Sequence, residues 1–155
     1  MTCSHERATL VDYRTKKPIA GSTQVQGDDW VWLFRITDTE LTGASLIFTA
    51  KSCIEDPDPG EIQLSSSVAT EIQIFTGATA SRMDAVIRVP SVLTENINIP
   101  LEMASIALLF DVQLMRSGTP VMAPKRETFF RHSNSKFVVI KDVTKAKVAP
   151  AVVTT

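Results

Sequence analysis

The chain has 155 residues, a length typical of one compact domain. Hydrophobic residues make up 44% of the sequence and charged residues 21%, so a core can form without disulfide or metal staples. The formal net charge of -1 lacks the strong basic field of a general nucleic-acid-binding protein. We therefore expect no nucleic-acid partner.

Membrane and export signals are also missing from the sequence. No uninterrupted apolar run is longer than Ile106–Phe110, far below the roughly 18 residues of a membrane span. No apolar stretch follows the mixed charges of residues 1–7, so we expect no secretory signal, no membrane partner and folding in a cytosol. Cys3 and Cys53 are too few for a disulfide framework, and we expect reduced thiols, with Cys53 at least half-buried at a strand end.

Bulky side chains recur at every second position in several segments, which is the periodicity of half-buried β-strands. The clearest example places Trp30, Trp32, Phe34 and Ile36 on one face. The predicted strands, in chain order, are Trp30–Thr37, Ala44–Ser52, Ile72–Ile74, Met83–Val89, Ile106–Met115 and Phe137–Val143.

The connections between these segments favour a β-sandwich. Arg116–Thr119 predicts a hairpin turn in which Gly118 takes a positive φ, and Val121 and Met122 would begin the return strand. Only Pro90–Ala104 has room for a helix, of one or two turns. Short strands without long helices predict an all-β fold of two sheets. Its expected core is Trp30, Trp32, Phe34, Leu46, Phe48, Ile87, Leu108, Phe110 and Val139.

The predicted organisation has three parts. Residues 1–23 form an N-terminal arm or edge strand, residues 24–145 form the sandwich, and residues 146–155 form a flexible tail without charge beyond Lys147. Charge is unevenly distributed, because Lys125–Lys147 holds seven basic and two acidic residues whereas Asp28–Pro124 holds five basic and thirteen acidic ones. This asymmetry indicates either solvated faces of opposite sign or complementary docking between subunits.

Two acidic groups are candidates for chemistry. The pair Asp28 and Asp29 precedes the first strand and favours a turn over acid–base catalysis, because such carboxylates bond their own backbone. The segment Glu55–Glu61 carries four carboxylates and is a candidate calcium loop, although its spacing is not that of an EF-hand. Its two prolines favour an exposed turn.

Histidine and tryptophan supply the remaining candidates. His132 lies beside Ser133 in a polar loop, but sequence adjacency does not make a catalytic triad, and His5 has no such neighbour. Trp30 and Trp32 are typical of a core, with stacking on a sugar as the alternative. We therefore expect no catalytic, cofactor-binding or metal-binding residues, no cofactor and no enzyme activity.

A wider pattern joins these segments. It comprises Gly27-Asp28-Asp29-Trp30, Leu41-Thr42-Gly43-Ala44, Phe110-Asp111-Val112-Gln113-Leu114, Ser117-Gly118 and Val143-Thr144-Lys145. Between Gln24 and Lys145 the chain resembles immunoglobulin-like domains of bacteriophage tails, such as the N-terminal domain of baseplate upper proteins. It differs from them in its longer insert, Arg126–Asn134, and in having no following fibre or coiled-coil segment.

The resemblance implies an immunoglobulin-like antiparallel β-sandwich with at most one short helix. It also implies a structural or adaptor protein of a phage or prophage tail, assembled in the bacterial cytoplasm. The expected partners are other tail or baseplate proteins and further copies of the chain. The alternative is a carbohydrate- or ligand-binding β-sandwich module, motivated by the tryptophans and the acidic loop. A small hydrolase that uses His132 and a serine is a third hypothesis.

Overall fold

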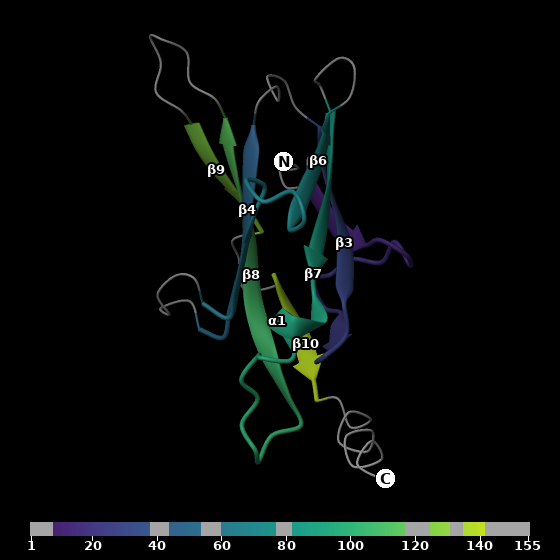
Figure 1. Ribbon diagram of the computed structural model, residues 1–155, viewed down its shortest axis with the longest axis vertical. Coiled ribbons are helices and arrows are strands. Elements are labelled where there is room, and N and C mark those ends of the chain that lie inside the picture. The colour runs from purple at the N-terminus through teal and green to yellow at the C-terminus, as the bar shows by residue number, and fades with distance from the viewer. Residues whose placement is uncertain are drawn as a thin grey trace, which may run out of the picture.

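Two β-sheets packed face to face make up the protein (Figure 1). The computed structural model describes residues 8–37, 44–53, 60–76, 82–116, 125–130 and 135–141. The predicted tail 146–155, the turn after Arg116 and the return at Val121 and Met122 lie outside these residues.

The smaller sheet has four antiparallel strands in the order β1-β3-β7-β6. Its central pair is the strongly alternating β3 and β7, whose register aligns Trp30 with Val89 and Thr37 with Arg82. The two strands are each eight residues long, so every β3 residue has a partner on β7. The bounds are β1 (Ala8–Asp12), β3 (Trp30–Thr37), β6 (Ile72–Thr76) and β7 (Arg82–Val89).

The larger sheet is built on the longest strand of the protein, β8. The order is β2-β10-β8-β4-β5, and β9 pairs with the second half of β8 while β10 pairs with its first half. All these pairs are antiparallel except β2 with β10. The bounds are β2 (Thr23–Val25), β4 (Ser45–Lys51), β5 (Ile62–Ser65), β8 (Ser105–Arg116), β9 (Lys125–Phe129) and β10 (Lys136–Ile140).

The strand order is that of an immunoglobulin domain. In that fold strands A, B, E and D form one sheet and strands C, F and G form the other. Here β1, β3, β7 and β6 take the first set of places, while β4, β8 and the β9–β10 pair take the second. The predicted immunoglobulin-like all-β sandwich is confirmed, and α1 (Ser91–Thr94) is the single short helix in the described ranges.

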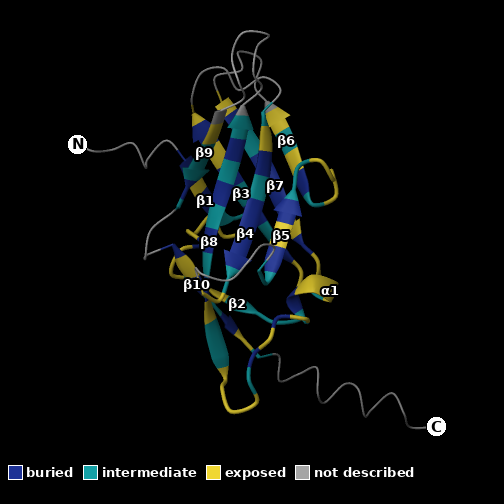
Figure 2. Cartoon of the chain, turned by 90° about the vertical axis from the view of Figure 1, so that its left-hand side faces the viewer, coloured by how far each residue is buried: buried dark blue, intermediate teal, exposed yellow. Residues whose placement is uncertain are grey.

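The core lies between the sheets, and all nine residues expected there are buried. Aromatic rings from both sheets meet at its centre: the Trp32 ring lies 5.3 Å from Phe48 and 5.3 Å from Phe137, both edge-on. Trp30 stacks on Trp32 at 5.6 Å. Burial of these faces, seen as dark bands along the strands in Figure 2, supplies the main stabilisation of the sandwich.

Two strands, β2 and β5, were not predicted. β1 lies within the segment expected to be an N-terminal arm or edge strand, and it is an edge strand of the smaller sheet. β9 follows the expected hairpin turn and pairs with β8, as a return strand would. The polar β9 pairs with β8 up to Phe129, after which Phe130 takes a left-handed conformation with φ 65. Pairing resumes where the Phe110 N–H donates to the Ser135 carbonyl at 3.0 Å. The insert expected at Arg126–Asn134 therefore begins as a strand and leaves the sheet after Phe129.

Burial predicts opposite outcomes for two phenylalanines on strands. Phe48 is fully buried, so Phe48→Ala should lower the free energy of unfolding by about 3–5 kcal/mol through lost apolar contacts and a cavity. Phe75 is 50% exposed, and Phe75→Ala should cost less than about 1 kcal/mol. Urea denaturation measures both values, and similar costs for the two substitutions would contradict the assigned core.

Candidate functional site

The two tryptophans form no binding platform. Trp30 is 3% exposed and Trp32 is fully buried, and the Trp30 Nε1–H donates to the Val25 carbonyl at 3.0 Å. An aromatic ring must offer a face to solvent before a sugar can stack on it. The sugar-stacking alternative therefore loses the residues that motivated it.

Asp28 and Asp29 fasten the helix α1 to the start of β3. The Ser91 N–H, at the first turn of α1, donates to the Asp29 carboxylate at 2.6 Å. The Asp28 carbonyl accepts the Thr94 hydroxyl at 2.8 Å. The predicted bond of a carboxylate to its own local backbone is therefore not what Asp29 forms, because Asp29 bonds a backbone N–H 62 residues away, and Asp28 contributes through its main-chain carbonyl.

Thr94 is the centre of this attachment and was missed by sequence reasoning. Its side chain is fully buried, and its Oγ1 also accepts the Gly27 N–H at 3.0 Å. Nearby, the Gln26 Nε2 donates to the Ile97 carbonyl at 3.0 Å. These bonds join residues almost 70 positions apart and hold the segment after α1 against the turn before β3.

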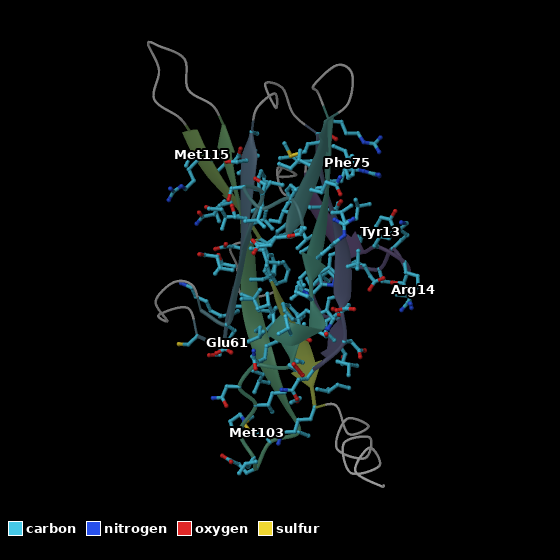
Figure 3. All side chains as sticks on the ribbon, in the orientation of Figure 1. Tyr13, Arg14, Glu61, Phe75, Met103 and Met115 are labelled. Atoms are coloured by element: carbon cyan, nitrogen blue, oxygen red, sulfur yellow. The ribbon has the colours of Figure 1, made fainter. Side chains whose placement is uncertain are left out.

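The segment held in this way presents apolar side chains to solvent at one end of the sandwich. Leu101 is 96% exposed and Met103 is 45% exposed, and Met103 lies at the lower end of the molecule (Figure 3). The end of β10 joins them, because the Lys141 Nζ donates to the Leu101 carbonyl at 3.2 Å and its N–H to the Ala104 carbonyl at 3.1 Å. We call this surface the apolar end, and its exposed residues are Leu101, Met103 and Ile140.

A groove of about 750 Å³ lies along the connection between β1 of the smaller sheet and β2 of the larger sheet. Asp12, Arg14, Lys17 and Gln24 are among its lining residues. Its exposed aromatic side chain is Tyr13, and the Lys16 ammonium lies 4.6 Å from the centre of that ring. One face of the tyrosine is therefore already covered by a cation.

The other predicted candidates come together at no site in the described structure. His5, His132, Cys3 and most of the loop Glu55–Glu61 lie outside the described residues. Cys53 is exposed, so the prediction that it is at least half-buried was wrong: β4 ends at Lys51, two residues earlier. Among the residues described, no three His, Cys, Asp or Glu side chains group as metal ligands, and no helix is long and apolar enough to cross a membrane.

Asp84 is the centre of a charge cluster on the outer face of the smaller sheet. Asp84 lies between Arg35, at 2.9 Å from its carboxylate, and Arg82, at 3.2 Å. Partial burial alone would raise the pKa of Asp84, but hydrogen bonds from Arg35 and Arg82 outweigh it and lower this pKa below its usual value. The cluster links β3 to β7 through the Arg35–Asp84 pair.

Neither protein-family models nor curated proteins match the sequence at a significant level.

The Thr94 hydroxyl provides a direct test of the attachment of α1. Thr94→Val keeps the shape of the side chain but leaves the partly buried Gly27 N–H without its acceptor, so it should lower the free energy of unfolding by about 1–3 kcal/mol. Thr94→Ser retains the hydroxyl and should cost clearly less. Chemical denaturation compares the two, and a valine variant as stable as the serine variant would contradict the role of the hydroxyl.

The Asp84 cluster predicts a pH-dependent contribution to stability. Because the folded-state pKa of Asp84 lies below the unfolded-state value, its stabilisation is present above the unfolded-state pKa and is lost as pH falls through the folded-state pKa. At neutral pH, Asp84→Asn should cost about 0.2–1 kcal/mol, the range of exposed ion pairs. Denaturation curves at neutral and acidic pH measure the difference, which should vanish in acid. A difference in the free energy of unfolding that stays the same in acid would refute the stabilising role of the ionised Asp84.

Proposed function

We propose that this chain is a non-enzymatic structural or adaptor module that acts by binding other proteins in the tail or baseplate of a phage or prophage. The apolar end is the observation that carries the proposal. The tail setting comes from the sequence resemblance, with assembly in the bacterial cytoplasm and a final location in the virion. An immunoglobulin-like sandwich is the architecture that this resemblance implies.

The apolar end has the properties of a protein-binding surface. Single exposed apolar residues are ordinary, but several gathered at one end mark an interaction site. Leu101 does not protrude from a loose loop, because its own carbonyl is bonded to Lys141 and the preceding Ile97 is buried. A preorganised surface loses little conformational entropy when a partner binds.

A ligand-binding module is the second candidate, favoured by the groove beside β2. Tyr13, and not a tryptophan, would be the aromatic contact in that groove. We prefer the assembly role because one face of Tyr13 is occupied by Lys16, whereas Leu101 is almost wholly exposed.

The proposal is tested by co-expressing the chain with the products of the genes that flank its own. We expect a stable complex with at least one tail protein. Leu101→Asp/Met103→Asp should weaken it at least about tenfold, because two carboxylates would have to be desolvated at the interface. Purification of the complex and light scattering at low and high salt give the masses and the affinity.

A matched variant controls for added charge alone. Tyr13→Asp/Val68→Asp places two carboxylates on exposed side chains away from the apolar end and should leave the complex intact. The absence of any complex with the flanking gene products would refute the proposal. Binding of a saccharide by a chain without protein partners would favour the second candidate instead.

A further inference from the structure

The outer strands of the two sheets are not equally protected against pairing with another chain. On β1, the outward Leu10 carbonyl accepts the Ile19 N–H at 3.0 Å, and the outward Asp12 N–H donates to the Lys17 carbonyl at 2.8 Å. The chain itself thus occupies this edge. Such protection is common, since an open strand edge is a template for further pairing.

The larger sheet has three outer strands, β2, β5 and β9. β9 carries the charged residues Lys125, Arg126 and Glu127, which discourage pairing with another chain. β2 and β5 are short and partly filled. β2 has three residues, and its Val25 carbonyl accepts both the Asp28 N–H and the Trp30 Nε1–H. β5 has four residues, and its Ser65 N–H donates to the Glu71 carboxylate at 2.9 Å. Neither edge offers an uninterrupted row of backbone groups.

The remaining edge, β6, is open. The Arg88 N–H donates to the Glu71 carbonyl at 2.8 Å, which fixes the alternation of the β6–β7 ladder. Gln73 and Phe75 therefore bond β7, whereas the N–H and carbonyl of Ile74 point outward. No hydrogen bond joins those outward groups of Ile74 to any part of the chain that the structure describes.

The sequence of β6 lacks residues that would prevent its pairing with a strand of another chain. Its sequence, Ile-Gln-Ile-Phe-Thr, contains no charge and no proline, the usual devices that protect an edge. Phe75 is half-exposed on the outer face, and Figure 3 shows it at the margin of the sheet. Ile74 is only partly buried where it packs against the core.

We propose that β6 pairs antiparallel with β6 of a second copy across a two-fold axis at Ile74, joining two four-stranded sheets into one of eight strands. The biological use of this dimer rests on the proposed role in assembly, but the dimer forms through β6 and not through the apolar end. Ile74 of the two copies would exchange both backbone hydrogen bonds. Gln73 of each copy would lie opposite Phe75 of the other.

A second copy suits this edge because the pairing is self-complementary. The outward groups of Ile74 supply one donor and one acceptor to their own equivalents. No like charges face each other, since neither Gln73 nor Phe75 is charged, and each half-exposed Phe75 ring would pack on the methylene groups of the opposite Gln73. Two five-residue strands bury less than the roughly 800 Å² per partner of a stable complex, so we expect dimerisation to depend on concentration.

Light scattering over a wide concentration range tests the proposal with the full chain. The wild-type mass should rise from 17.0 kDa toward twice that value. Ile74→Pro removes the outward N–H without touching the bonds to β7, and it should raise the dimer dissociation constant at least about tenfold. Circular dichroism confirms that the variant keeps its β structure.

A positively charged and a negatively charged variant of β6 test the register without the use of a proline substitution. Gln73→Lys/Phe75→Lys and Gln73→Glu/Phe75→Glu should each be monomeric, because four like charges would meet at the axis, whereas a mixture of the two should form a heterodimer. Thr9→Lys/Gln63→Lys adds the same charge at exposed positions on β1 and β5 and should dimerise like the wild type.

The outcomes separate this inference from the proposed function. A wild-type chain that stays at 17.0 kDa, an Ile74→Pro variant that associates normally, or charge variants that fail to pair when mixed would overturn it. Dimers that bind no tail protein would instead refute the proposed function and leave the β6 contact standing. Leu101→Asp/Met103→Asp should dimerise normally.

Discussion

Contact between aromatic rings of the two sheets is the constraint on which the rest of the molecule depends. Trp32 of the smaller sheet is fully buried and meets Phe48 and Phe137 of the larger sheet edge-on. Closely packed edge-on rings restrict both the spacing and the relative rotation of the sheets. The strand edges and the apolar end take their positions from this packing.

Much of the fold follows from alternation in the sequence, and the missing parts have identifiable causes. β3 was predicted with the right bounds because each inward residue is bulky. β2 was not predicted, because it is three residues long and exists through its parallel pairing with β10. β9 was anticipated only as a return strand without an end, because it is mostly polar and is supported by β8. These segments are strands because of their partners in the sheet, and the local sequence pattern does not reveal those partners.

The candidate surfaces were less predictable than the fold. Thr94 is an ordinary residue in the sequence, and its role comes from bonds to Gly27 and Asp28 that only the folded chain brings close. Leu101 is one of many leucines, and no local pattern distinguishes an exposed leucine from a core one. Cys53 was misplaced because the expected strand was extended beyond Lys51. Burial depends on the whole sandwich, so single-residue inferences fail first at strand ends.

The two proposed surfaces have a geometric relation that bears on adaptor function. The strands run along the long axis of the sandwich, and the apolar end lies at one extremity of that axis (Figures 1 and 3). Antiparallel pairing through β6 reverses the strand direction between copies, so a dimer would direct its two apolar ends away from each other. Such a dimer would join two copies of the same partner at opposite ends, because two-fold symmetry duplicates every binding surface. Edge pairing would thereby turn a module with one binding end into a link between two components.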